Sequence, residues 1–190
     1  MNKYIFASSN QNKLLEISQQ LSNIELLSLK DIDFNDEIIE SGLTLQENAL
    51  IKSKIIFDKY NLPTIADDTG LEVNALNGAP GVISARYAGK KANALENIKK
   101  LLHNMTHFTD RRARFKTIIS LTTHSEQLFF EGVVEGIITT KNSGTLGFGY
   151  DPIFVPNGHK KTFAEMSLDQ KNSISHRSRA IKKLVDYLGI

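Results

Sequence analysis

The stretch KYIFASSNQNK, at residues 3–13, is the clearest indication of fold class in this chain of 190 residues. Its opening residues 3–7 are mostly apolar and predict a short buried strand. Ser8, Ser9 and Asn10 follow and are typical of a tight turn that caps a helix. Apolar residues then recur at helical spacing, at Leu14, Leu15, Ile17 and Leu21. A strand, a turn and a helix in this order indicate an α/β fold.

The next part of the chain repeats this alternation of helix and strand. Thr44 and Glu47 form a capping box, which predicts a helix that extends to about residue 60. A second short strand is predicted over residues 64–66. We expect this strand to end at Asp67 and Asp68, so that both acids lie at its carboxyl end.

Further elements are predicted in the second half of the chain. Asn93 and Glu96 are expected to open a helix. The other predicted elements are a half-buried strand over 113–121, strands over 128–130 and 133–138, and a final helix over roughly 175–188. No repeat, low-complexity tract or long linker divides the chain, so residues 1–190 are expected to form a single domain with room for two lobes.

The composition excludes several classes of protein. The chain has no cysteine, which rules out disulfides, thiolate metal sites and a cysteine nucleophile. The first residues contain no apolar run long enough for a signal peptide or a membrane span, so we expect a cytoplasmic protein. The formal charge of +2 is too balanced to indicate a general nucleic-acid or membrane surface.

Four segments have compositions that neither a core nor a solvated surface requires. The first is residues 8–13, where a strand-to-helix turn directs backbone N–H groups toward a phosphate and Lys13 adds a positive charge. An ordinary helix cap is the alternative for this segment. The second is residues 67–70, whose acids follow Glu37 and Glu40 in sequence. Carboxylates suit Mg²⁺, although a cap or an Asx-turn would use the same residues.

The third segment is residues 144–152, rich in glycine. Its glycines would let the backbone approach a flat ligand, and Phe148 or Tyr150 offers a ring for stacking. A turn that ends in an edge strand is the alternative. The fourth segment, residues 171–177, is polar and basic, and its donors suit a ligand rich in oxygen atoms. A solvated helix start would have the same composition.

Other motifs give weaker signals. Neither a phosphate loop nor a dinucleotide-binding fingerprint occurs. His103 and His107 are four residues apart but lack the glutamate of a zinc hydrolase helix. The basic residues over 111–116 would suit a nucleic-acid surface, but a solvated strand face is the simpler interpretation.

The four segments occur in an order that resembles the inosine triphosphate pyrophosphatase family. Its members are also called non-canonical purine NTP pyrophosphatases. The resemblance covers nearly the whole chain. The matching stretches are residues 7–13, Glu40-Ser41-Gly42 with Glu47-Asn48-Ala49, residues 66–71, Gly78-Ala79-Pro80-Gly81 with Ser84-Ala85-Arg86-Tyr87, residues 147–154 and Ser175-His176-Arg177.

The resemblance implies a fold and an activity. The implied fold is an elongated mixed β-sheet with flanking helices that form two lobes around a central nucleotide cleft. The implied activity is the hydrolysis of ITP, dITP and XTP to the monophosphate and pyrophosphate, which removes these nucleotides from the pool. Mg²⁺ is the implied cofactor, with Mn²⁺ as a substitute. A homodimer is implied, with no nucleic-acid or membrane partner.

The resemblance also assigns residues to roles. Asp68 is the implied proton acceptor for the attacking water, and Glu40 and Asp68 are the implied metal ligands. The residues implied to bind the phosphate side of the nucleotide are Ser8, Ser9, Asn10, Gln11, Asn12, Lys13, Lys52, Thr69 and Lys171. Those implied to contact the base are Phe148, Gly149, Tyr150, Asp151, His176 and Arg177.

Base selection would follow from hydrogen-bond donors and acceptors. Arg177 donates, so it suits the C6 oxygen of inosine and xanthosine, whereas the C6 amino group of adenine would leave buried donors unpaired. A catalytically idle nucleotide sensor is the alternative function. It would have no need of the water-activating acid that Asp68 provides. The residues alone do not separate Asp67 from Asp68, since the two acids are adjacent.

Overall fold

The computed structural model describes residues 3–90 and 93–190, and within them the backbone forms a seven-stranded mixed sheet. The strands are β1 (Lys3–Phe6), β2 (Glu25–Ser28), β3 (Thr64–Val73), β4 (Pro80–Gly81), β5 (Arg112–Thr122), β6 (Gln127–Ile138) and β7 (Phe154–Pro156). Their order is β2-β1-β3-β5-β6-β7, and β4 pairs with β3. β1 is parallel to β2 and β3, whereas β4 and β7 run antiparallel to their partners. The predicted mixed α/β fold is confirmed.

Three of the helices begin at side-chain caps that the sequence predicted. The helices are α1 (Gln11–Ser18), α2 (Leu45–Tyr60), α3 (Ala94–Asn104), α4 (Leu168–Asn172) and α5 (His176–Leu188), with 3₁₀ turns at Asn74–Leu76, Ser84–Arg86, Asp151–Ile153 and Phe163–Glu165. Asn10 caps α1, Thr44 with Glu47 forms the capping box of α2, and Asn93 caps α3. These caps satisfy backbone N–H groups that have no partner inside the helix. The predicted helix starts are therefore correct to within about one residue.

The chain divides into two compact units that are interleaved in sequence. Unit 1 contains Met1–Asp68, Thr117–Gly132 and Arg177–Ile190, and unit 2 contains Thr69–Lys116 and Val133–His176. β3, β5 and β6 each begin in one unit and end in the other. Each unit has a hydrophobic core of its own.

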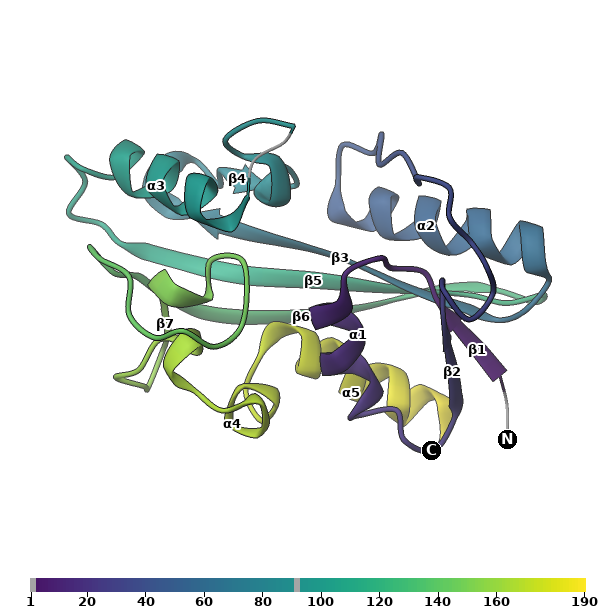
Figure 1. Cartoon of the computed structure of the whole chain (residues 1–190). Helices are drawn as coiled ribbons and strands as arrows, with labels where there is room; N and C mark the ends of the chain where they lie inside the picture. The colour runs from purple at the N-terminus through teal and green to yellow at the C-terminus, as the bar shows by residue number, and fades with distance from the viewer. Residues whose placement is uncertain (1–2, 91–92) are drawn as a thin grey trace. The chain divides into compact units, whose positions relative to one another are not determined.

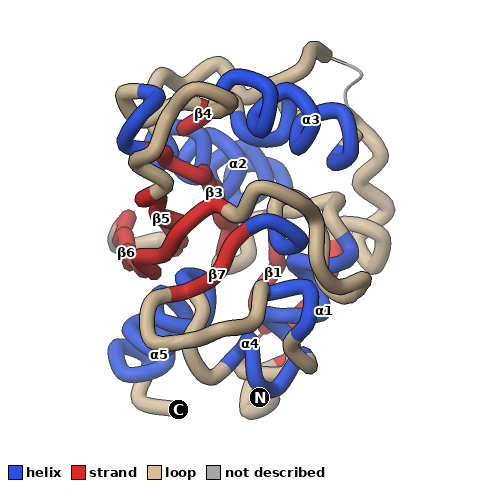
Figure 2. The backbone as a smooth tube through the Cα atoms, turned by 90° about the vertical axis from the view of Figure 1, so that its left-hand side faces the viewer, coloured by secondary structure: helices blue, strands red, loops and turns tan. Residues whose placement is uncertain are grey.

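Unit 1 has helices on both faces of its strands. Figure 1 shows α2 on one face and α1 and α5 on the other, and the end-on view in Figure 2 agrees. On the α1 and α5 face, Ile65 packs with Ile17 and Ile181. On the α2 face, Ala66 packs with Ile56. Both faces of these strands are thus covered, as is typical of parallel strands.

Unit 2 has a core rich in aromatic side chains. α3 contributes Leu101, and the strands contribute Phe115 and Phe154, whose ring centroids lie 4.7 Å apart. Phe163 stacks on Phe154 at 5.3 Å. This core holds the chain that follows β6 against the strands of unit 2.

Three expectations about the elements are wrong. The strand predicted to end at residue 66 continues through Asp67 and Asp68 to Val73 as β3. The two strands predicted over 128–130 and 133–138 are one strand, β6, because the polar side chain of Glu131 faces outward and does not interrupt pairing. Leu15, expected on the apolar face of α1, is 52% exposed. β2, β4, β7 and α4 were not predicted.

No helix within residues 3–90 and 93–190 has both the length and the hydropathy that a membrane span requires.

Gly136 allows β6 and β7 to pair closely. A Cβ atom at this position would overlap the carbonyl oxygen of Val155 and the ring of Phe154. Gly136 is opposite Pro156 in the antiparallel pairing of the two strands. We therefore predict that Gly136→Ala lowers the free energy of unfolding by about 1–3 kcal/mol, the usual cost of overpacking. Urea denaturation would measure this.

Glu135→Ala is the matched control for this substitution, because Glu135 is the neighbouring residue of β6 and its side chain is exposed. It should leave the urea midpoint nearly unchanged. Equal midpoints for the two variants would show that β7 accommodates the added methyl group.

Candidate active site

β3 places the two adjacent acids on opposite faces of the sheet. Successive side chains of a strand point to opposite sides. Asp67 therefore shares the face of Ile65, which packs with α1 and α5, and Asp68 shares the face of Ala66, which packs with α2. Neighbours in sequence thus meet different helices and different charges.

Asp67 is fully buried and is held by two cations. Lys13 Nζ of α1 lies 3.0 Å from its Oδ1, and Arg177 of α5 donates to Oδ2 from Nε at 3.0 Å. Arg177 also pairs with Glu16 of α1 and is itself 1% exposed. Burial alone would raise the pKa of Asp67, but Lys13 and Arg177 outweigh it and hold that pKa below its usual value. Asp67 is therefore a charged anchor that ties α1 and α5 to β3.

The two carboxylate oxygens of Asp68 have different surroundings. Lys52 Nζ of α2 lies 3.3 Å from Asp68 Oδ1. Asp68 Oδ2 is buried and has no hydrogen-bond partner among the described residues. Burial raises the pKa of Asp68, although Lys52 opposes that rise. A buried acceptor without a donor is uncommon and indicates a site for a ligand, an ion or a water.

Glu40 completes this group of charges. Lys52 Nζ also lies 2.6 Å from Glu40 Oε1, so the two carboxylates share one ammonium group. The burial of Lys52 would lower its pKa, but Asp68 and Glu40 raise it, so this ammonium stays protonated. Two carboxylates and one ammonium leave a net negative charge, which a bound cation would balance.

The donors around Lys52 fit Mg²⁺ better than a metal that needs a protein cage. Within residues 3–90 and 93–190, no group of three or more His, Cys, Asp or Glu side chains could hold a metal ion. Mg²⁺ keeps several waters and typically takes one or two carboxylates together with substrate phosphate oxygens. Glu40 and Asp68 supply two carboxylates of this kind.

The segment 8–13 forms the N-terminus of α1. The side chain of Asn10 accepts from the backbone N–H groups of Asn12 and Lys13, so Asn10 is the helix cap that was the alternative interpretation. The side chains of Ser9, Gln11 and Asn12 are exposed. Burial lowers the pKa of Lys13, while Asp67 opposes that shift. The segment therefore combines exposed polar groups with the positive end of a helix.

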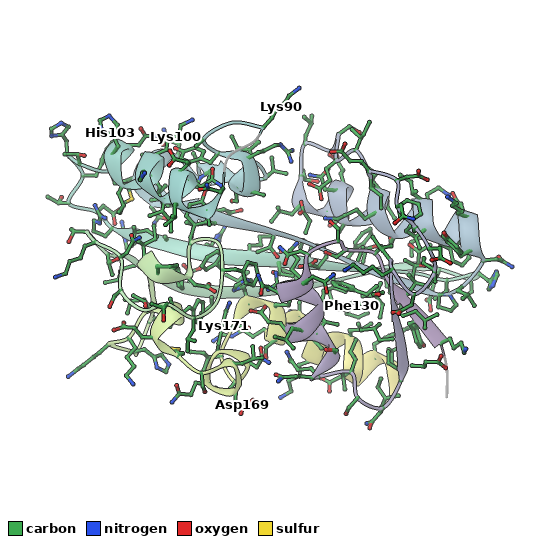
Figure 3. The ribbon with its side chains drawn as sticks, in the orientation of Figure 1. Lys90, Lys100, His103, Phe130, Asp169 and Lys171 are labelled. Carbon is green, nitrogen blue, oxygen red and sulfur yellow. The ribbon has the colours of Figure 1, made fainter. Side chains whose placement is uncertain are left out.

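In unit 2, the loop that carries Phe148 is fixed by a buried ion pair. Asp151 Oδ2 accepts from Lys171 Nζ at 2.6 Å and from the backbone N–H of Phe148 at 2.8 Å. Lys171 Nζ also lies 4.7 Å from the centroid of the Phe148 ring. Figure 3 shows Lys171 directed inward from α4, whereas Asp169 on the same helix points outward. A Cβ atom at Gly147 would overlap the Asp151 carboxylate, which explains the glycine there.

Lys171 is one of the residues that the resemblance assigned to phosphate. It is 2% exposed, and its ammonium is part of the Phe148 loop. Tyr150 is 4% exposed, and its hydroxyl donates to the Ser84 carbonyl at 2.8 Å. Burial raises the pKa of Tyr150. Of the two rings considered for stacking, Phe148 is thus the half-buried one.

The remaining predicted site residues lie at the start of α5, within β3 and in the Phe148 loop. His176 begins α5 and stacks on Phe115, with ring centroids 4.6 Å apart. Thr69 is half-buried and follows Asp68 in β3, and Gly149 follows Phe148 with a φ of 61°.

Sequence reasoning missed Glu16. It is 2% exposed and pairs with Arg177, which lies far away in the chain. The available signal was an acid flanked by apolar residues on a predicted helix, three positions after Lys13. Such an acid must find a buried cation.

The basic residues over 111–116 contact the protein itself. Arg111 donates to the carbonyl oxygens of Ile138 and Met105. Arg112 pairs with Asp110 at 2.8 Å, and Arg114 pairs with Glu72 at 2.6 Å. These contacts favour a structural role over a nucleic-acid surface.

The structure thus combines a mixed α/β fold with two carboxylates that share one lysine. The chain also matches a known family over almost its full length. Residues 4–187 match the model of the Ham1 family, and the chain belongs to that family.

Relatives with assigned names are similar over whole chains. The chain is 51% identical to a dITP/XTP pyrophosphatase of Christiangramia forsetii, covering 98% of each chain. It is 48% identical to a dITP/XTP pyrophosphatase of Flavobacterium johnsoniae, covering 98% of this chain and 97% of the relative. The solved Ham1 protein of Staphylococcus aureus superposes with a TM-score of 0.90 at 40% identity, covering 99% of this chain and 98% of that one. A HAM1 protein from Coxiella burnetii gives 0.91 at 40% identity, covering 100% and 99%.

Asp67 should contribute strongly to the stability of the fold. Asp67→Asn leaves Lys13 and Arg177 buried without the charge that they surround. Removing one partner of a buried ion pair usually costs about 3–5 kcal/mol. We predict a loss of that size in the free energy of unfolding, measured by urea denaturation. Asp36→Asn is the control, since Asp36 pairs with Lys59 at the surface with 74% of its side chain exposed. A loss no greater than that of the control would contradict the anchoring role.

The stabilising effect of Asp67 should also depend on pH. Because the pKa of Asp67 is lower in the folded chain, its contribution is complete above the unfolded value of about 3.9 and is lost as pH falls through the folded value. Asp68 acts in the opposite sense, since its pKa is raised and its protonation relieves the cost of burial. We predict that unfolding free energy falls more steeply below about pH 4 in the native chain than in Asp67→Asn. Equal slopes would contradict this.

Proposed function

We propose that this chain is a dITP/XTP pyrophosphatase, which hydrolyses non-canonical purine nucleoside triphosphates to the monophosphate and pyrophosphate. The observation that carries the proposal is the environment of Asp68. This buried carboxylate shares Lys52 with Glu40, and its Oδ2 atom has no hydrogen bond within residues 3–90 and 93–190. The names of full-length relatives at 51% and 48% identity support the substrate class.

Asp68 is the proposed general base. Its free Oδ2 can accept the proton of the water that attacks the α-phosphorus. The raised pKa of Asp68 makes it a better proton acceptor near neutral pH than a solvated aspartate. Asp67 is unsuited to this role, because Lys13 and Arg177 hold its carboxylate.

Glu40 and Asp68 are the proposed ligands of Mg²⁺, with Mn²⁺ as a substitute. The bound ion would neutralise charge on the phosphate oxygens. In this proposal, Lys13, Lys52 and the exposed N-terminus of α1 attract a triphosphate of about −4 charge. The ion pairs of both lysines hold their ammonium groups in place before the substrate arrives, and Asp68 and Glu40 raise the pKa of Lys52.

The base is proposed to contact Phe148, whose loop Asp151 and Lys171 hold in place. Arg177 supplies donors for the C6 oxygen of hypoxanthine and xanthine, and Glu16 with Asp67 sets the plane of its guanidinium. Adenine has an amino group at C6, so it would leave those donors unpaired.

The proposal has a cellular and an assembly part. Residues 1–190 would act as one catalytic domain, as a homodimer in the cytoplasm. There the enzyme would remove dITP, ITP and XTP before a polymerase can incorporate them into DNA or RNA.

Pyrophosphate release tests the reaction directly. We predict Mg²⁺-dependent release from dITP and XTP that clearly exceeds release from ATP and GTP. Asp68→Asn should lower kcat by about 10²–10⁴-fold, the usual contribution of a general base. Asp36→Asn should leave kcat unchanged, since Asp36 is a surface residue whose side chain pairs with Lys59.

Two outcomes would contradict the proposal. In ¹⁸O-water, the label should enter the monophosphate, and label in pyrophosphate would place the attack on the β-phosphorus instead. Tight binding of dITP without turnover by the native chain would favour a nucleotide sensor.

A further inference from the structure

The segment that carries Glu40 has no regular secondary structure of its own. Residues 37–42 form neither helix nor strand. They are held by two side chains of α2. Lys52 pairs with Glu40 at 2.6 Å, and Asn48 Oδ1 accepts from the backbone N–H of Gly42 at 2.8 Å. The position of Glu40 thus depends on α2.

Asn48 and Gly42 form a close, partly buried contact. Asn48 is 0% exposed. A Cβ atom at Gly42 would lie 2.7 Å from Asn48 Oδ1 and 2.7 Å from Glu47 Cβ. Any side chain at position 42 would therefore push this segment away from the helix. The hydrogen bond requires both the amide and the glycine.

Asn48 is an unusual residue for its position. Its Nδ2 is buried and has no hydrogen-bond partner among the described residues. A buried donor without an acceptor destabilises a fold, and an apolar side chain of similar size would avoid that cost. The hydrogen bond to Gly42 is the contact that the amide makes and an apolar residue could not.

The ion pair of Lys52 does not replace this hydrogen bond. A lysine ammonium is a point charge on a flexible stem, so it attracts Glu40 without fixing its direction. Asn48 lies one helical turn before Lys52 on the same face of α2 and holds the backbone two residues beyond Glu40. One face of α2 therefore holds both the Glu40 carboxylate and the backbone of Gly42.

We propose that Asn48 is a positioning residue for the metal site: by binding Gly42, it sets the Glu40 carboxylate beside Asp68. This inference rests on the proposed function, because it takes Glu40 and Asp68 as the metal ligands. Asn48 itself contacts neither substrate nor metal in this proposal.

Binding of Mn²⁺ to the full chain, followed by the EPR signal of the free ion, tests the inference without turnover. Asn48→Ala should weaken Mn²⁺ binding by about 10–100-fold, the usual effect of removing a residue that orients a metal ligand. Gly42→Ala breaks the same hydrogen bond from the other side and should have the same effect. The double variant should be no weaker than either single variant, since only one contact is lost.

Thr44→Ala is the matched control. It removes the cap of α2 at Glu47 but leaves the Gly42 contact intact, so it should destabilise the chain without changing Mn²⁺ affinity. In activity measurements, Asn48→Ala should raise the Mg²⁺ concentration for half-maximal rate. The KM for dITP at saturating Mg²⁺ should stay near the native value. A purely structural role would not give this split.

Glu40→Gln distinguishes a wrong positioning role for Asn48 from a wrong metal site. If Glu40→Gln weakens Mn²⁺ binding while Asn48→Ala and Gly42→Ala do not, the positioning role is wrong and the metal site stands. If Glu40→Gln has no effect on Mn²⁺ binding, the metal site itself is wrong and the inference falls with it. Should Asn48→Ala fail to fold, Gly42→Ala decides the matter.

Discussion

The structure depends on the alternation of side chains along β3. Two adjacent aspartates in the middle of a buried strand must face opposite sides of the sheet, and each needs its own compensating charges. Asp67 meets Lys13 and Arg177, whereas Asp68 meets Lys52. Burying two charged side chains in one strand costs free energy, but the alternation also gives them different roles. Asp67 holds the fold together, and Asp68 is the proposed catalytic residue.

The two sides of β3 differ in how completely their charges are matched. On the α1 and α5 side, Asp67 and Glu16 face Lys13 and Arg177 through short contacts. On the α2 side, two carboxylates share one ammonium, and one of their oxygens has no hydrogen bond among the described residues. Matched charges hold helices in place, while unmatched ones attract a cation or a water.

Much of this fold could be predicted from local signals. Caps such as Asn10, Thr44 and Asn93 act within one helical turn, so the helix starts were predicted correctly. The fold class and the family relationship are also confirmed. Asp67 was placed at a strand end because acids disfavour strand interiors. Its compensating partner Arg177 lies 110 residues later, which no local pattern reveals. The roles assigned to individual site residues stay predictions.

The distance in sequence between Asp67 and Arg177 affects how the chain can fold during synthesis. The N-terminal segment of unit 1 emerges from the ribosome long before α5 does. Until α5 is made, Asp67 has Lys13 but lacks its guanidinium partner, and the face of β3 that α5 covers stays open to solvent. A chain that ends before residue 177 would therefore bury Asp67 in its central strand without the guanidinium that balances its charge.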